Sequence, residues 1–354
     1  MTDALDALVD RVFAAAQART PLRIRAGGSK DFYGNACEGE RLDPRGYSGI
    51  VSYEPTELVI TARCGTPLVE VEAALQDKGQ MFGFEPPHFA TTATIGGMVA
   101  AGLSGPRRAA TVGGGAVRDF MLGATLLSGR GDVLRFGGQV MKNVAGYDVS
   151  RLLTGSLGTL GLILDASIKV VPRPLAEQTV RLAANESTAI RNVNTWAGQP
   201  WPVSATCWHD GALHVRLSGS AASVREARAA LGGDEVGDAG FWRALREQSR
   251  PFFTDAPERA LWRLSVPSTT PPLDLGPTLI EWGGALRWVR SDAPAASIRA
   301  RARAAGGHAT LFRGGDRSAG AFQPLDPVIE KIHARLKAEF DPHGIFNRGR
   351  MYDA

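Results

Sequence analysis

Glycine placement constrains this chain more than any other feature, because the glycines gather in short segments whose spacing fits neither a helix nor a strand. One such segment runs from Lys142 to Ile163, and its glycines are Gly146, Gly155, Gly158 and Gly161. Glycine has no side chain, so it allows tight turns and close approach of the backbone to a ligand. The apolar run 160–168 predicts a strand that leads away from this turn. An ordinary glycine-rich corner would explain this segment by itself. Whether it is instead part of a ligand site depends on the other glycine segments.

Two earlier segments have the same character. The short strand expected over 22–26 leads into Gly27-Gly28-Ser29-Lys30-Asp31, a turn whose backbone N–H groups can form an anion-binding nest. The other segment comprises 94–97, which reads Thr-Ile-Gly-Gly, and 102–106, which reads Gly-Leu-Ser-Gly-Pro, with Pro86 and Pro87 upstream. Three such loops in one half of a chain predict one extended ligand that carries phosphate groups.

Composition sets wider bounds. The 354 residues, 44% of them hydrophobic and 21% charged, are enough to bury a large core and to form two domains. The net charge of +4 comes without a block of like charges, which argues against nucleic-acid binding. Cys37, Cys64 and Cys207 have no spacing typical of disulfides, zinc or iron–sulfur clusters, so we expect a cytoplasmic protein. We also expect no membrane span and no secretion signal.

The periodicity of apolar residues predicts both helices and strands. Helices are expected over 3–19, 67–78, 221–231, 295–305 and 327–339. Thr66 is expected to cap the second of these, with Pro67 as its first residue. Strands are expected over 22–26, 57–63, 213–217, 262–266 and 278–282, with a hairpin formed by 120–127 and 133–136. No internal repeat stands out.

A further signature lies at the end of the chain, where 340–350 reads Phe-Asp-Pro-His-Gly-Ile-Phe-Asn-Arg-Gly-Arg. Together with the glycine segments, it resembles the FAD-linked oxidases of the vanillyl-alcohol oxidase and D-lactate dehydrogenase superfamily. The whole chain resembles the family of FAD-binding E subunits of bacterial glycolate oxidases. This resemblance implies an α+β fold, with a two-subdomain FAD-binding domain of the vanillyl-alcohol oxidase type and an α+β cap domain.

The same resemblance, with the prolines at 172 and 174 as a boundary, gives the expected domains. The FAD-binding domain is expected over 1–173, with subdomains of about 1–110 and 111–173. The cap is expected over 174–326, and the helix and tail of 327–354 are expected to return to the FAD-binding domain.

The expected cofactor is FAD, held through backbone N–H groups and small residues of the glycine segments. It is expected to be non-covalent, because residues 25–34 contain no histidine of the kind that relatives use for attachment. Met98 and Gly102 stand where relatives such as the catalytic subunit typically have asparagine. The residues expected to bind FAD are Arg25, Ala26, Gly27, Gly28, Ser29, Lys30, Pro86, Pro87, Thr94, Ile95, Gly96, Gly97, Gly102, Gly105, Gly158, Gly161, Leu162 and Ile163.

The catalytic residues are harder to assign. Oxidation of a 2-hydroxy acid needs a base for the hydroxyl proton and a cation for the carboxylate. The candidate bases are His88, His209, His214, His308, His333 and His343, and each is individually more often structural than catalytic. His308 with Arg313 is the preferred pair, although strand alternation places the two on opposite faces. The histidine cluster that often holds a metal in catalytic relatives is missing, so no metal site is expected.

Three hypotheses follow for the function. In the first, the chain is the FAD-binding subunit of a glycolate oxidase complex, in which glycolate is oxidised to glyoxylate and electrons pass through flavin to partner subunits. The implied partners are a catalytic flavoprotein subunit and an iron–sulfur subunit, through which any membrane association would come. In the second, the chain is a non-catalytic assembly subunit with structural FAD. The third, a free-standing D-2-hydroxy acid dehydrogenase, is disfavoured by the missing histidine cluster and the short cap.

Overall fold

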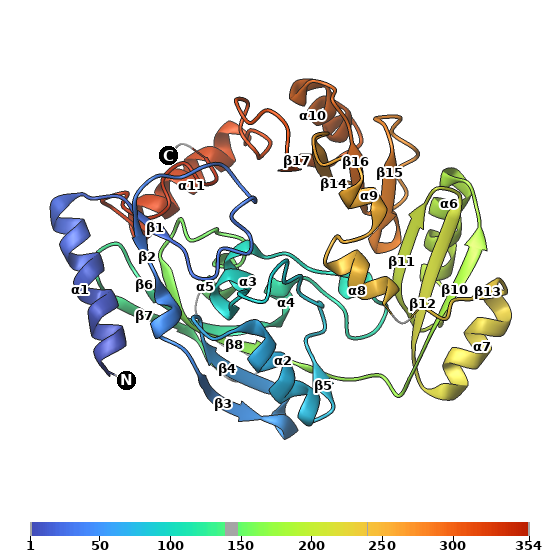
Figure 1. Ribbon diagram of the computed structural model, residues 1–354, viewed down its shortest axis with the longest axis horizontal. Coiled ribbons are helices and arrows are strands. Elements are labelled where there is room, and N and C mark those ends of the chain that lie inside the picture. The colour runs from blue at the N-terminus through green and yellow to red at the C-terminus, as the bar shows by residue number, and fades with distance from the viewer. Residues whose placement is uncertain (1, 139–147, 239, 353–354) are drawn as a thin grey trace.

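The computed structural model describes residues 2–138, 148–238 and 240–352. The first part of the segment 142–163, including Gly146, therefore lies outside the described residues. Two β-sheets dominate the chain, one built from residues of the first half and the other from residues after 175 (Figure 1).

The first sheet has five antiparallel strands in the order β3-β4-β8-β6-β7. Its strands are β3 (Ile50–Glu54), β4 (Val59–Arg63), β6 (Met121–Leu127), β7 (Val133–Gly137) and β8 (Leu162–Lys169). Two small ladders accompany it: β1 (Leu22–Ile24) with β2 (Glu40–Leu42), and β5 (Gln80–Met81) with β9 (Val171–Pro172). The helices of this half are α1 (Thr2–Ala18), α2 (Leu68–Asp77), α3 (Ile95–Ala101), α4 (Val117–Phe120) and α5 (Val149–Leu152).

Strand β8 shows why this sheet has helices on both faces. Successive side chains of a strand point to opposite faces. Leu162 and Leu164 pack with α1 and the C-terminal tail, whereas Ile163 packs in the cluster that contains the buried residues of α2 and α3. The start of β8 is thus buried on both sides, which explains why it reads as a continuous apolar run rather than an alternating one.

The second sheet has eight antiparallel strands in the order β13-β10-β12-β11-β15-β16-β14-β17. They are β10 (Ala176–Ala183), β11 (Val203–His209), β12 (Ala212–Gly219), β13 (Asp234–Glu235), β14 (Leu261–Ser265), β15 (Thr278–Glu281), β16 (Leu286–Arg290) and β17 (His308–Arg313). Its helices are α6 (Glu186–Ala197), α7 (Ala221–Leu231), α8 (Phe241–Arg246), α9 (Pro251–Thr254) and α10 (Ala295–Ala304).

This sheet contains a structural repeat that the sequence did not reveal. If the strands of each half are numbered along the chain, both halves have the spatial order 4-1-3-2, and they meet edge to edge at β11 and β15. This is the strand order of a ferredoxin-like unit. The halves differ in length and in their helices, because β14 and β15 are joined without the helix that joins β10 to β11. A fixed sequence period is therefore absent.

The C-terminal segment returns to the first half of the fold. Helix α11 (Pro327–Phe340) and the tail lie beside the N-terminal elements (Figure 1). The buried carboxylate of Asp341 accepts hydrogen bonds from the backbone of Ile345 at 2.9 Å and of Phe346 at 2.8 Å, and from Lys337 at 2.6 Å. The tail then runs beside β1, where Leu22 forms a parallel bridge with Phe346.

A buried ion cluster and an aromatic cluster join the two sheets. Glu85, in the first half, accepts from Arg216 of β12 at 2.9 Å and from Arg107 at 3.4 Å. Burial alone would raise the pKa of Glu85, but the two guanidinium groups hold it below its usual range. Beside this cluster, Phe312 of β17 packs on Tyr33, with ring centroids 5.3 Å apart. These contacts fix how the second sheet lies against the first.

The predicted α+β class is confirmed, and most predicted elements are present within a few residues of their expected bounds. One cap was wrong: the N-cap of α2 is Pro67, and Thr66 instead donates its hydroxyl to the Arg63 carbonyl at 2.6 Å. Within the described ranges, no helix is long and apolar enough to cross a membrane. The division at 173 and 326 into domains stays a prediction.

Candidate functional site

A cleft between β1, α3, the start of β8 and the C-terminal tail brings the predicted glycine segments together. It consists of two cavities of about 310 and 90 Å³. We call them together the glycine-lined cleft, because both are lined by Ile24, Ala26, Thr94, Gly97, Ala100, Leu157 and Asn347. Among the residues predicted to bind FAD, those on its walls are Arg25, Ala26, Gly27, Gly28, Ser29, Lys30, Thr94, Gly96, Gly97, Gly158, Gly161, Leu162 and Ile163.

The loop 25–31 is held in place through its carbonyl groups. The side chains of Arg41, Thr92 and Arg350 donate hydrogen bonds to it from β2, from the segment before α3 and from the tail. The acceptors, at 2.8 to 3.3 Å, are the carbonyls of Arg25, Ala26, Gly27, Lys30 and Asp31. In addition, the Gly28 carbonyl accepts from the Asp31 N–H at 3.1 Å. The acceptors of the loop are therefore almost all in use.

The backbone N–H groups of the same loop, in contrast, are mostly unpaired. Within the described part of the chain, the N–H groups of Ala26, Gly27, Gly28, Ser29 and Lys30 have no hydrogen-bond acceptor. Gly28 has a φ of 70°, a left-handed conformation that suits glycine and turns successive N–H groups toward one point. Five consecutive free donors on the wall of a cleft form a site for an anion.

Two cations of this loop differ in their availability. Arg25 already pairs with Asp31, at 2.6 Å between Nε and Oδ2. Within the ranges that the structure covers, Lys30 Nζ donates two long bonds, each of 3.3 Å, to Ser29 Oγ and to the His88 carbonyl. Burial lowers the pKa of Lys30 to about 8, and the nearby carboxylate of Glu247 opposes this shift. Of these two cations, Lys30 is therefore the one that would attract an anion in the cleft more strongly.

The glycine pair at the start of α3 plays a different part. Its N–H groups are in use, because Gly96 donates to the Cys64 carbonyl at 2.8 Å and Gly97 donates to Thr94 Oγ1 at 3.2 Å. A Cβ atom on Gly97 would meet only Thr94 Oγ1, at 3.3 Å, and would otherwise occupy the cleft. Gly97 therefore supplies space for a ligand rather than a hydrogen-bond donor.

The tail completes the cleft with residues that sequence analysis did not assign to it. Asn347 accepts from the Ile24 N–H at 2.8 Å and donates to the Leu157 carbonyl at 2.6 Å. A Cβ atom on Gly158 would lie 2.7 Å from Asn347 Nδ2, so this position needs glycine for the tail to pack. The terminal signature 340–350 marked the segment, but not the roles of Asn347 and Arg350.

Five predicted residues lie away from the walls of the glycine-lined cleft. They are Pro86, Pro87, Ile95, Gly102 and Gly105. Ile95 is in the core, and Gly102 ends α3 in a left-handed conformation. Pro87 and Gly105 line a separate cavity of about 20 Å³ between the two sheets, which has room for about one water molecule.

That small cavity holds an unusual set of polar groups. Glu281 accepts from Trp288 Nε1 at 2.7 Å, and burial raises the pKa of Glu281 to about 7 despite this bond and the nearby Arg263. Ser104 Oγ and Gln248 Oε1 are buried and have no partner among the described residues. A small polar group such as water would satisfy them.

His308 and Arg313 are not brought together. His308 is exposed at the first position of β17 and Arg313 is at the last, where they pair with Ser265 and Leu261 of β14. Arg313 lies over the ring of Phe32, 4.2 Å from its centroid, close to the loop 25–31. The described residues contain no group of three or more His, Cys, Asp and Glu side chains arranged to hold a metal.

Known proteins with the same domain and fold identify the class of protein to which this chain belongs. Residues 3–137 match the family model of the FAD binding domain. Alkyldihydroxyacetonephosphate synthase superposes with a TM-score of 0.67 at 15% identity, covering 96% of this chain and 74% of that protein. The chain therefore has an FAD-binding fold of the vanillyl-alcohol oxidase type.

The relatives in sequence are more specific. Glycolate oxidase subunit GlcE of Escherichia coli K12 is 51% identical over 351 residues, which cover 99% of this chain and 98% of that protein. Glycolate oxidase subunit GlcD of Bacillus subtilis 168 is 31% identical over 168 residues, 46% of this chain and 34% of that protein. The chain belongs to the GlcE family.

Proposed function

We propose that this chain is the FAD-binding subunit of a glycolate oxidase complex. Its near full-length likeness to the GlcE subunit supports this, and the matched FAD binding domain supports the cofactor. The structural observation that carries the proposal is the run of five free N–H groups at 26–30 on the wall of the glycine-lined cleft. The pyrophosphate of FAD is the group that such donors fit.

The proposed roles follow from the positions of the residues. The N–H groups of 26–30 would hold the pyrophosphate, and Lys30 would add a positive charge. Gly97 leaves space beside Thr94, and the smaller cavity, walled by Cys64 and Ile163, would take another part of FAD. FAD, when bound, accepts a hydride or single electrons. Retention is expected to be non-covalent, since residues 25–34 contain no histidine.

The partners remain part of the proposal. A GlcE-like chain is one subunit of a larger enzyme, and we expect a catalytic flavoprotein subunit and an iron–sulfur subunit beside it. The three cysteines of this chain are far apart in sequence, and two of them, Cys64 and Cys207, are buried, so an iron–sulfur cluster would have to come from a partner. Any attachment of the complex to a membrane would also come from partners.

A second candidate function is supported by the small cavity between the sheets. Glycolate has five non-hydrogen atoms, whereas a cavity of about 20 Å³ has room for about one water molecule. The neighbouring space is filled by aromatic rings, including Phe312 and Trp288 at 4.8 Å between centroids. Glycolate therefore does not fit between the two sheets unless these rings move. On that observation the second candidate is a subunit that relays electrons, or holds FAD structurally, while another subunit oxidises glycolate.

An anaerobic visible spectrum with glycolate shows whether this chain oxidises glycolate itself or only relays electrons. Flavin that bleaches in the purified chain alone would show that this chain oxidises glycolate. Bleaching only in the presence of the partner subunits would identify a relay. A chain that retains no flavin after incubation with FAD would refute both flavin-dependent roles and favour pure assembly.

A further inference from the structure

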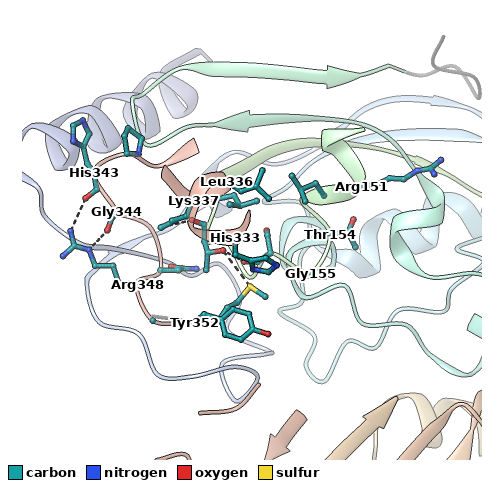
Figure 2. Close-up of a pocket in the computed structure, with 18 of the residues that line it drawn as sticks. Arg151, Thr154, Gly155, His333, Leu336, Lys337, His343, Gly344, Arg348 and Tyr352 are labelled. Carbon is teal, nitrogen blue, oxygen red and sulfur yellow. Dashed lines mark hydrogen bonds between the residues drawn. The ribbon is translucent and has the colours of Figure 1, made fainter. Parts of the chain in front are cut away.

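A larger open groove lies behind the glycine-lined cleft. It measures about 950 Å³ and lies between α11 with the tail on one side and α5 with the loop 154–160 on the other (Figure 2). Leu157 and Gly158 of that loop line the cleft, whereas Gly155 and Thr159 line the groove. Asn347 lines both. One layer of backbone and one side chain therefore separate the groove from the proposed flavin site.

Helix α11 presents an unpartnered apolar face at this groove. Its apolar residues recur at helical spacing, as Val328, Ile332, Leu336 and Phe340, with Ile329 on the adjacent row. Only Phe340 is buried, while 65% of Val328, 43% of Ile329 and 47% of Ile332 are exposed. Across the groove, Leu152 of α5 is 40% exposed.

Other helices of the chain bury such faces. The stripe of α1 at Leu8, Val12 and Ala16 is buried against the tail and β8. An amphipathic helix normally packs its apolar face on a core, so the exposed face of α11 indicates that something else covers it in the working protein. The area is continuous with the groove, because Ile329 and Ile332 precede the lining residues His333 and Leu336 by one helical turn.

The charge of the groove indicates what covers it. Its basic lining residues are Arg118, Arg151, His333, Lys337, His343 and Arg348, and within the described ranges no Asp or Glu lines it. Some of these cations are used internally. Lys337 pairs with Asp341 at 2.6 Å. Arg348 donates to the carbonyls of Gly344 and His343 (Figure 2).

Two cations at the α5 side are better placed to meet a partner. Arg151 has an exposed side chain and, among the described residues, forms an ion pair only with its neighbour Asp148, at 3.0 Å. Arg118 is exposed and makes no ion pair in the part of the chain that the structure describes. An acidic surface with apolar side chains at its centre complements this arrangement, because interfaces combine an apolar core with a charged rim.

We propose that this groove docks an acidic, amphipathic segment of another redox subunit of the same complex. Its apolar side chains would cover Leu152, Ile332 and Leu336, and its carboxylates would face Arg118 and Arg151. The inference rests on the proposed function, since it assigns the partner to the glycolate oxidase complex. A subunit in this position lies next to the flavin site, as exchange of electrons requires.

The test uses the complex with the catalytic flavoprotein and iron–sulfur subunits of the same organism, purified through a tag on this chain. Ile329→Gln with Ile332→Gln removes exposed apolar contact, and Arg118→Glu reverses a charge. The matched controls are Val112→Gln with Leu175→Gln, which are 76% and 92% exposed elsewhere, and Arg225→Glu on α7. We expect the groove variants to raise the Kd for a partner subunit about tenfold or more, with FAD content and Tm unchanged, while the controls bind normally.

Several results would overturn the docking site. In the first, both groove variants bind the partner with normal affinity. In the second, the variant with Ile329→Gln and Ile332→Gln binds more weakly but also has a lower Tm, while Arg118→Glu binds normally. A dimer of the chain alone that the groove variants dissociate would assign the groove to a second copy instead. The proposed function fails separately: a chain without FAD that still binds its partner through the groove would refute the flavin assignment and leave the docking site in place.

Discussion

The substitution Glu281→Gln tests the buried polar cavity between the sheets. Glu281 is only 5% exposed, and its Oε1 accepts from Trp288 Nε1 at 2.7 Å. Burial raises the pKa of this carboxyl from the usual 4.5 to about 7, with Trp288 and Arg263 opposing the shift. Glutamine keeps an acceptor for Trp288 and cannot ionise, so the substitution isolates the titration.

Proton linkage determines whether Glu281 makes the protein more or less stable as pH rises. The folded protein holds this proton up to about pH 7, whereas the unfolded chain releases it near pH 4.5, so Glu281 makes the wild type lose stability as pH rises through that window. At about 1.4 kcal/mol per pH unit, the full effect is ~3 kcal/mol. The free energy of unfolding of Glu281→Gln, relative to wild type, should therefore increase by ~3 kcal/mol between about pH 4.5 and pH 8.

Urea unfolding followed by circular dichroism at a series of pH values measures this difference. Glu235→Gln, at an exposed position of β13, is the control and should show no such trend. A difference between Glu281→Gln and wild type that stays constant from acid to neutral pH would contradict the raised pKa, because it would mean that Glu281 titrates as a solvated carboxyl.

Three further predictions concern the cleft and the tail. FAD affinity of the wild type should fall as pH rises above about 8, where Lys30 loses its proton, whereas Lys30→Gln should bind FAD more weakly and without that pH dependence in fluorescence titrations. Gly97→Val should lose FAD while its Tm stays close to that of the apo wild type, because the added side chain occupies the cleft and little else; normal flavin content would place the cofactor elsewhere. Asp341→Ala should lower the free energy of unfolding by about 3 kcal/mol in urea titrations, since it leaves two buried N–H groups without their acceptor and removes the carboxylate that pairs with the half-buried Lys337; a loss below about 1 kcal/mol would contradict this.

Local chemistry explains what could be predicted from the sequence. Gly27 to Lys30 could be predicted to form a tight turn because turn conformation depends on adjacent residues, and Gly28 does adopt the left-handed conformation. That the turn holds an anion stays a prediction. The helices and strands were found because apolar periodicity follows directly from which face is buried. Both kinds of signal lie within a dozen residues of sequence.

Contacts between distant segments explain what could not be predicted. Asn347 bonds Ile24 and Arg350 bonds Lys30 across more than 300 positions. The terminal signature indicates that the tail returns to the first half, but the neighbours of Asn347 and Arg350 in the sequence do not show which atoms they contact. Glu281 and Arg263 also read as ordinary strand residues until the fold places them in one cavity. For the same reason Glu281 does not stand out in the sequence as a candidate base, since its raised pKa arises mainly from burial, with a smaller contribution from the nearby Glu85.

The most direct test of the central claim is the FAD content of the purified full-length chain after incubation with FAD and removal of the excess. We expect a flavin spectrum at about one FAD per chain, with the flavin released intact on denaturation and lost in Gly97→Val. A wild-type chain that is folded yet retains no flavin would contradict the assignment of the glycine-lined cleft as an FAD site.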